Sequence, residues 1–229
     1  MPSNLSIKRH HIIDKDLQTM IDEFFSHHDW KGLYLTGGTC LSEFYFGHRQ
    51  SVDMDLFTQD KEIFLAARQV LTQENFFPFG KLKAQRAFPE FSEFLLTRKT
   101  GDPIKIDLVL DIPIRIEKPI KFEHIYLDDL SDITANKLGC LIQRNEVKDY
   151  LDLFYLIPTL DLPVKELVEL GQKKDGSLDA MILAHQMEFI QTVKAPPSYF
   201  LANVPWKQVQ TFFRHLHDEM LEDLLLKNI

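Results

Sequence analysis

The stretch GGTCLSEFYFGHRQSVDMDLF, residues 37–57, joins a glycine turn to two aspartates one residue apart. The apolar run KGLYLT just before it (31–36) predicts a buried strand that the glycines end. TCLSEFYFG (39–47) is compatible with a short helix, and SVDMDLF (51–57) alternates polar and apolar residues as a half-buried strand does. The stretch therefore predicts a strand, a turn, a helix and a second strand in succession.

The sequence on both sides extends this unit. Apolar residues at helical spacing predict amphipathic helices over 14–29 and 60–76. Three further strands are predicted at 82–88, 90–99 and 103–111. The break Gly101-Asp102-Pro103 has the composition of a turn and predicts a hairpin between the last two of these strands.

From about residue 128 the pattern changes, since apolar residues now recur every three or four positions. Helices are predicted at 127–144, 148–157, 165–174, 179–193 and 205–228. We therefore expect an α+β protein in two domains. A mixed β-sheet core flanked by helices occupies 1–127, and a mostly helical C-terminal domain occupies 128–229.

Composition narrows the class of protein. The chain has 229 residues, 45% of them hydrophobic and 26% charged, which is typical of a soluble globular protein. No run approaches the roughly 18 apolar residues that span a bilayer, so we expect a cytoplasmic protein with no membrane partner. The net charge of −8 disfavours indiscriminate coating of nucleic acid. The two cysteines, Cys40 and Cys140, match no metal-binding spacing and are expected to be reduced.

Two aspartates mark the first candidate site. Residues i and i+2 of a strand point to the same side, so Asp53 and Asp55 should project together. The apolar residues beside them are expected to face the core: Val52, Met54 and Leu56. Alternation in PIKIDLVLD makes Asp107 a third acid on a neighbouring strand. Such acids could bind Mg²⁺, and two metal ions between them would suit phosphoryl transfer. The alternative is a solvated strand edge without a ligand.

The glycines favour the metal interpretation. Gly37 and Gly38 free the backbone to approach a ligand, and N–H groups at the start of the following helix favour an anion. Phosphate is the natural occupant, which would bring a triphosphate and its metal ions into one cleft. Arg49 could bind phosphate or support the two acids. The candidate nucleotide-binding residues of this stretch are Gly37, Gly38, Thr39, Ser42, Arg49 and Ser51.

These residues resemble a known motif. GGT followed by R-x-S-x-D-x-D-L-F, from Arg49 to Phe57, is similar to the first motif of nucleotidyltransferases of the AbiEii/AbiGii toxin type, within the polymerase-β-like superfamily. A second motif of that family, a helix with a lysine and an arginine followed by basic-Asp-x-x-Asp-Leu, is matched by Lys137, Arg144 and KDYLDL (148–153). The resemblance covers roughly residues 30–157, and it implies a nucleotidyltransferase-like sheet.

The resemblance implies an enzyme that transfers an NMP from an NTP to an acceptor, with Mg²⁺ as cofactor and pyrophosphate as product. Lys137 and Arg144 would contact the nucleotide, and Asp149 would complete the active site. The expected catalytic residues are thus Asp53, Asp55, Asp107, Lys137 and Asp149, of which the first three bind metal. An ion pair between the two helices, joining Lys137 or Arg144 to Asp149, is the structural alternative. The roles of Asp111 and Asp152 stay open.

The resemblance also implies partners. Members of the family act as toxins of bacterial toxin–antitoxin or phage-defence systems, and some add nucleotides to tRNA 3′ ends. It thus implies an NTP substrate, a tRNA acceptor and a cognate antitoxin. A small molecule or a protein is the alternative acceptor, since an acidic protein suits a cationic one, and a catalytically idle binding module is the alternative class. KLKAQR (81–86) and Arg98-Lys99 could form a basic rim for a polyanionic acceptor.

Overall fold

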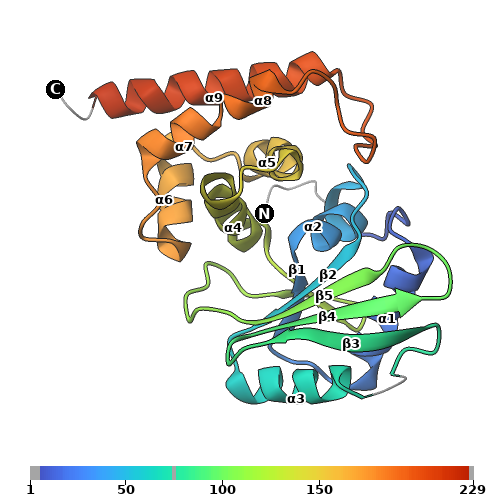
Figure 1. Ribbon diagram of the computed structural model, residues 1–229. Helices are drawn as coiled ribbons and strands as arrows, with labels where there is room; N and C mark the ends of the chain where they lie inside the picture. Colours follow the sequence, from blue (N-terminus) through green and yellow to red (C-terminus); the bar gives the residue numbers. More distant parts are fainter. Residues whose placement is uncertain (1–5, 74–75, 227–229) are drawn as a thin grey trace. The chain divides into compact units, whose positions relative to one another are not determined.

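The computed structural model describes residues 6–73 and 76–226 and contains two compact units. The sheet unit comprises Ile7–Pro113 and Lys118–Asp129. The helical unit comprises Ile114–Glu117 and the chain from Leu130 onward. Figure 1 shows the strands of the first unit and the helices of the second. The domain boundary after residue 127 stays a prediction.

The sheet unit is built on a seven-stranded mixed sheet with the order β3-β4-β5-β2-β1-β7-β6. The strands are β1 Leu33–Thr36, β2 Asp53–Thr58, β3 Gly80–Ala87, β4 Phe91–Arg98, β5 Ile104–Leu110, β6 Ile120–Phe122 and β7 Ile125–Leu127. β2 runs parallel to β5 and β1 runs parallel to β7, whereas the other neighbours are antiparallel. The predicted mixed sheet is confirmed. Sequence analysis missed β6 and β7, because three residues are too few to establish an alternating pattern.

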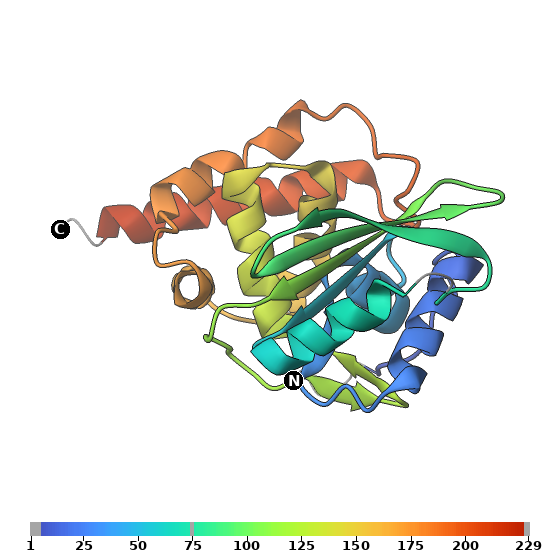
Figure 2. The ribbon, with the colours of Figure 1, turned by 60° about the horizontal axis from the view of Figure 1, so that its bottom comes forward.

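One face of the sheet is covered by helices α1 (Lys15–His27) and α3 (Lys61–Leu71). α3 packs on β2 and β5, α1 packs on β2 and β7, and Figure 2 shows both helices in front of the sheet. Apolar residues of the central strands are fully buried on this face, among them Met54, Leu56, Ile106 and Leu108. Val52 was predicted to share that face, and the prediction is wrong. It precedes β2, outside the alternation of the strand, and is 61% exposed.

The segment after β1 is helical from the first glycine. Gly37–Cys40 form a short helix, α2, which continues as a π-helix, η1, over Leu41–Phe46. Gly47 ends η1 in the left-handed conformation (φ 63°), which glycine adopts without steric cost. The sequence placed the start of this helix at Thr39, two residues late.

The helical unit contains α4 (Leu130–Gln143), α5 (Val147–Leu160), α6 (Val164–Lys174), α7 (Ala180–Gln186), α8 (Phe189–Thr192) and α9 (Trp206–Leu226). α4 packs against α5, α6 and α7, and α9 lies along α5, α6, α7 and α8. The predicted helix 127–144 begins only at Leu130, because Leu127 still belongs to β7. The predicted helix 179–193 is divided into α7 and α8. No helix in the described part of the chain is both long and apolar enough to cross a membrane.

Asp132 holds the short segment 114–117 to the helical unit. Its carboxylate is fully buried and accepts hydrogen bonds from the backbone N–H groups of Ile116 and Glu117. It also forms ion pairs with Lys174 (3.0 Å) and Arg115 (3.5 Å). Because a buried carboxylate needs such partners, this cluster explains why the segment belongs with the helices.

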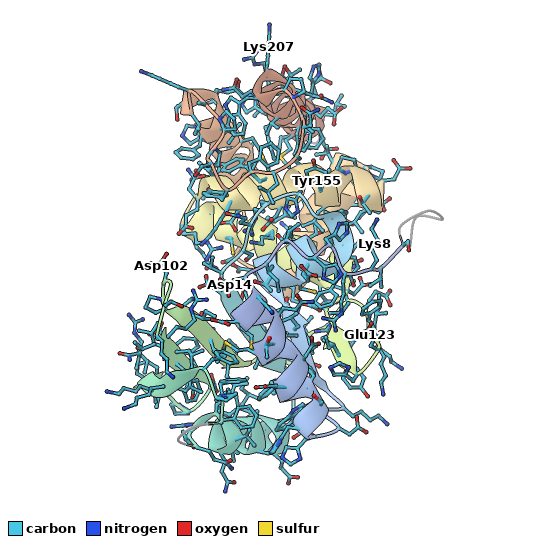
Figure 3. All side chains as sticks on the ribbon, turned by 90° about the vertical axis from the view of Figure 1, so that its right-hand side faces the viewer. Lys8, Asp14, Asp102, Glu123, Tyr155 and Lys207 are labelled. Atoms are coloured by element: carbon cyan, nitrogen blue, oxygen red, sulfur yellow. The ribbon has the colours of Figure 1, made fainter. Side chains whose placement is uncertain are left out.

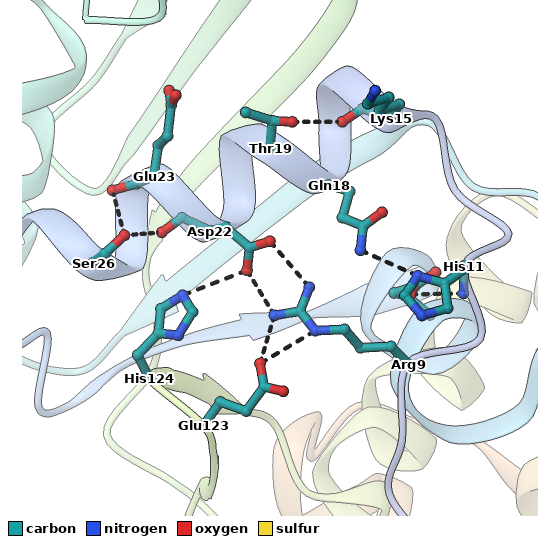
Figure 4. Close-up of polar contacts among 11 residues, drawn as sticks. Arg9, His11, Lys15, Gln18, Thr19, Asp22, Glu23, Ser26, Glu123 and His124 are labelled. Carbon is teal, nitrogen blue, oxygen red and sulfur yellow. Dashed lines mark hydrogen bonds and ion pairs between the residues drawn. The ribbon is translucent and has the colours of Figure 1, made fainter.

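Arg9 joins three parts of the sheet unit (Figure 4). Its guanidinium contacts Asp22 of α1 (2.6 Å) and Glu123 in the turn between β6 and β7 (2.7 Å). His124 from the same turn approaches Asp22 at 3.4 Å. Arg98 of β4 has a similar role at the other end of α1, where it contacts Asp14. Its side chain is only 9% exposed, so Arg98 does not belong to the exposed basic rim suggested by the sequence. Figure 3 labels Asp14, at the start of α1, together with Asp102, whose backbone carbonyl accepts a hydrogen bond from Arg98.

Glu43 of η1 fixes the segment that precedes α1. The side chain is completely buried, and its carboxylate accepts hydrogen bonds from the backbone N–H groups of His11 (2.9 Å) and Ile12 (3.1 Å). His11 adopts a left-handed conformation (φ 55°) here. Backbone N–H dipoles therefore help to balance the charge of Glu43.

Replacing Glu43 by glutamine tests this contact. Glu43→Gln keeps the shape of the side chain but removes the charge and one acceptor oxygen, so the free energy of unfolding should fall by about 1.5–3 kcal/mol. Urea denaturation measures this loss, and the amides of residues 11 and 12 should exchange faster with solvent. The control is Glu90→Gln, at an exposed position. Equal stability of the two variants would contradict the role assigned to Glu43.

Candidate active site

Three predicted acids lie on one face of two adjacent parallel strands. Asp55 of β2 is the register partner of Asp107 of β5, and Asp53 is the partner of Lys105. Paired residues of neighbouring strands point to the same side of a sheet, and here that side is opposite the face that α1 and α3 cover. The alternation predicted for β5 is confirmed, since Ile104, Ile106 and Leu108 are buried on the other face. Asp53, Asp55 and Asp107 therefore form an acidic face.

Lys105 places a cation inside this acidic face. Its Nζ lies 2.6 Å from Oδ2 of Asp107. Burial by itself would lower the pKa of Lys105, but the hydrogen bond to Asp107 and the charges of Asp107, Asp53 and Asp55 outweigh it and raise the pKa. Lys105 was not among the predicted site residues. The signal was available, because residues i and i+2 of a strand share a face.

The acidic face has oxygen donors suited to a hard divalent cation. Oδ1 of Asp107 is buried and accepts no hydrogen bond from the described residues, so this oxygen has capacity for a ligand. Within residues 6–73 and 76–226, no three His, Cys, Asp or Glu side chains are already grouped as a metal site. The carboxylate oxygens are thus donors of the type that fits Mg²⁺. They come from Asp53 and Asp55 on β2 and from Asp107, the register partner of Asp55, on β5.

The two glycines make room for side chains of this same face. Thr36, the last residue of β1, is the register partner of Asp55, which brings Gly37 beside that carboxylate. Gly37 has a φ of 70°, and a Cβ there would overlap the carboxylate oxygen of Asp55 and lie 3.1 Å from its Cγ. A Cβ on Gly38 would lie 3.0 Å from Cζ of Arg49. In this structure the groups nearest the glycines are therefore the chain's own Asp55 and Arg49.

The hydroxyl residues of the motif differ in their surroundings. The Thr39 hydroxyl donates a hydrogen bond to the backbone carbonyl of Asp53 and lies 2.9 Å from Oγ of Ser51. Ser42 is completely buried, and its hydroxyl has no partner among the described residues. Arg49 is 4% exposed and donates to the carbonyl of Gln50 (3.0 Å). Thr39, Ser51 and Arg49 thus adjoin the start of β2, whereas Ser42 lies in the interior of η1.

Asp128 is a buried acid that sequence analysis did not select. It is 1% exposed and accepts a hydrogen bond from the Thr36 hydroxyl (2.5 Å), while its backbone carbonyl accepts one from the Tyr45 hydroxyl (2.8 Å). Burial and the charges of Asp128 and Asp55 raise the pKa of the Cys40 thiol, which therefore stays protonated. Asp128 fixes the end of β1, where the glycine turn begins. This role was hard to predict, because the pattern of LDDL (127–130) is typical of the start of a helix.

The helical unit contains the second predicted cluster. Lys137 of α4 is 5% exposed, and its Nζ lies 2.7 Å from Asp149 and 2.7 Å from Asp152, both on α5 and both fully buried. Arg144 donates two hydrogen bonds to Asp149, of 2.9 and 2.7 Å, from a side chain that is 42% exposed. The ion pair that the sequence left open is therefore present. It does not test whether Lys137 or Arg144 also contacts a nucleotide.

The charges of this cluster stabilise one another. Burial alone would raise the pKa of Asp149, but the hydrogen bond from Arg144 and the charge of Lys137 hold it below the usual value. A carboxyl group whose pKa is lowered by folding stabilises the folded state above the pKa of the unfolded chain. This stabilisation is lost as the pH falls through the folded pKa.

Asp111, the other acid whose role was open, accepts a hydrogen bond from Tyr34 (2.9 Å) in the sheet unit.

Removing Lys137 takes a cation away from two buried carboxylates, Asp149 and Asp152. Lys137→Met should lower the free energy of unfolding by about 3–5 kcal/mol, the cost of leaving a buried charge without its partner. Adding Asp152→Asn or Asp149→Asn should recover part of this loss, because either change removes one of the two charges. Urea denaturation of the single and double variants measures the effect.

The matched control is Lys165→Met on α6, whose side chain is 60% exposed, and it should change little. A Lys137→Met protein as stable as this control would show that the ion pairs do not hold α4 to α5.

The chain matches known proteins over most of its length. The family model described as nucleotidyl transferase AbiEii toxin, Type IV TA system, matches residues 9–224. An uncharacterized protein of Aquifex aeolicus (strain VF5) is 28% identical over 195 residues, covering 83% of this chain and 88% of that protein.

Two solved structures share the fold. JHP933 from Helicobacter pylori aligns with a TM-score of 0.60 at 14% identity, covering 94% of this chain and 97% of its own. MenT4, a nucleotidyltransferase toxin from Mycobacterium tuberculosis H37Rv, aligns with a TM-score of 0.58 at 13% identity, covering 90% of this chain and 83% of its own. Because the family model covers both units, the chain belongs to the family of AbiEii nucleotidyltransferase toxins of type IV toxin–antitoxin systems.

Proposed function

We propose that the protein is a Mg²⁺-dependent enzyme that transfers an NMP from an NTP to an acceptor and releases pyrophosphate. The observation that carries this proposal is the register pair of Asp55 and Asp107, with Asp53 on the same face and the glycine turn beside Asp55. Bound Mg²⁺ would neutralise charge on the phosphates and favour in-line displacement. The family membership supports nucleotidyl transfer as the reaction class.

The residues of the sheet unit would have separate roles in binding metal and substrates. Asp53 and Asp55 would hold the metal that carries the triphosphate. Asp107 would bind a second ion and orient the acceptor hydroxyl, for which its unbonded Oδ1 is suited. The backbone of Gly37 and Gly38, with Thr39 and Ser51 nearby, would position the phosphates.

In the helical unit, Arg144 and Lys137 are the proposed phosphate contacts, with Asp149 holding both cations. Arg144 is the more accessible of the two, because 42% of its side chain is exposed, whereas the Lys137 side chain is 7% exposed. Lys137 already contacts two carboxylates. Both roles are supported by the family motif rather than by a bound ligand.

We propose tRNA as the acceptor, and an antitoxin as a protein partner that follows from the toxin family. The edge strand β3 favours a polyanion. Lys81 and Lys83 are exposed on this strand. Lys83 is the register partner of Leu95, and Arg86 is the register partner of Glu93. Leu95 and Glu93 are in turn paired with Lys105 and Asp107, so these basic residues lie on the same side of the sheet as the acidic face. A cationic small molecule remains the competing acceptor, on account of the net charge of −8.

The acceptor is tested by incubating the protein with each of the four α-labelled NTPs, Mg²⁺, and total tRNA, total protein or aminoglycoside-like polyamines. Label that migrates with tRNA and is released by ribonuclease supports the proposal. Label on protein or on a polyamine would replace tRNA as the acceptor, and no transfer to any acceptor with any NTP would favour an idle binding module.

The metal-binding acids are tested by Asp53→Asn and Asp55→Asn. Each should lower transfer by at least about 10²–10³-fold, since a metal contributes several kcal/mol to the transition state. Mg²⁺ with NTP should raise the melting temperature of the wild type by mass action and should do so far less in these variants. Asp102→Asn, in the exposed turn before β5, is the control. Wild-type transfer rates in both site variants would refute the mechanism.

The acceptor surface is tested by Lys81→Glu combined with Lys83→Glu. Reversing two charges should raise the KM for tRNA by about tenfold or more, because the two lysines on the edge strand would contact the polyanion. The KM for NTP should not change. Lys31→Glu, at the opposite end of β1 from the glycine turn, is the control. An unchanged KM for tRNA in the double variant would exclude β3 as the acceptor surface.

A further inference from the structure

Lys105 is a cation that lies among the carboxylates of the acidic face. Its backbone pairs with Asp53 on one side and with Leu95 on the other, and Asp107 is two residues further along the same strand. All three acids raise its pKa, which means that their charges reach its ammonium. A lysine at this position is unexpected in a site proposed to bind divalent cations, because it repels them.

Lys105 contacts one of the two carboxylate oxygens of Asp107. The ammonium lies 2.6 Å from Oδ2, whereas the buried Oδ1 accepts no hydrogen bond from the described residues. The Asp107 side chain is 17% exposed and the Lys105 side chain is 36% exposed. The Lys105 side chain therefore has more solvent around it than the carboxylate, and it can move away from Asp107.

We propose that Lys105 is a tethered counter-ion of the acidic face: its ammonium neutralises Asp107 while no metal is bound, and it leaves Asp107 when a divalent cation binds. Lys105 is thus a positioning residue that sets how tightly the site holds a metal. This inference rests on the proposed function, because it requires that the acids bind a divalent cation.

Electrostatics supplies the reason for such a residue. Asp55 and Asp107 are in register on adjacent strands, and two close carboxylates raise each other's free energy unless a cation lies near them. A single ammonium lowers that repulsion in the free protein. A lysine suits the task better than an arginine, because it is a compact charge on a flexible four-carbon chain and can be displaced.

The alternative is an ordinary ion pair that only stabilises the strand. It differs in what it predicts for metal affinity. A counter-ion competes with the metal, so removing it must strengthen metal binding. A purely structural pair does not compete, so removing it changes stability alone.

The test measures Mn²⁺ binding by electron paramagnetic resonance on the full chain without nucleotide, and the melting temperature in the presence of a chelator. Lys105→Met should bind Mn²⁺ about tenfold more tightly, in line with the effect of a neighbouring charge on a carboxylate. Its melting temperature in chelator should fall by about 2–4 °C, and saturating Mn²⁺ should remove the difference. Lys105→Arg keeps the charge and should stay close to the wild type in affinity.

Lys61→Met is the matched control, because Lys61 is exposed at the start of α3, the helix that covers the opposite face of the sheet. It should leave the affinity for Mn²⁺ unchanged. Lys105→Gln gives a second neutral variant if Lys105→Met does not fold.

The outcomes separate the two proposals. A wild type that binds Mn²⁺ and a neutral variant with equal or weaker affinity would overturn the counter-ion role alone, whatever the melting temperatures. A wild type that binds no Mn²⁺ would overturn the metal-dependent mechanism and the counter-ion role with it. Tighter binding by both neutral variants, with Lys61→Met unchanged, supports the inference.

Discussion

The repulsion between carboxylates on two neighbouring strands is the constraint on which the rest of the sheet unit depends. Asp55 and Asp107 are brought into register by the parallel pairing of β2 with β5. This register puts both side chains on one face of the sheet, while α1 and α3 pack on the other face.

The glycine turn is adapted to the same constraint. β1 ends beside Asp55, so the next residue along the chain lies against the Asp55 carboxylate, which leaves no space for a Cβ. Gly37 meets this requirement and also takes the left-handed conformation that the turn needs. Asp128 holds the preceding residue, Thr36, through its hydroxyl. The motif therefore has a structural role within the site in addition to any contact with phosphate.

The protein buries several other acids, and each has a different kind of partner. Glu43 accepts backbone N–H groups, Asp128 accepts a hydroxyl, and Asp132 accepts both backbone groups and cations. Asp149 receives an arginine and a lysine. These partners satisfy carboxylates that would otherwise be costly to bury. Asp107 differs, because its buried Oδ1 accepts no hydrogen bond within the described part of the chain. This oxygen therefore has capacity for a ligand.

The order of the main elements, the mixed sheet and the family could be predicted from the sequence, because the alternation in β2 and β5 and the motif from Gly37 to Asp55 depend only on local spacing. Asp53 and Asp55 were likewise predicted to share a face, with Asp107 as a third acid on a neighbouring strand. Tertiary structure alone decided the pairing of Asp55 with Asp107, the contact of Lys105 and the burial of Lys137 between two aspartates. Strand register and helix packing bring together residues that are distant in sequence, and local patterns carry no information about such distances.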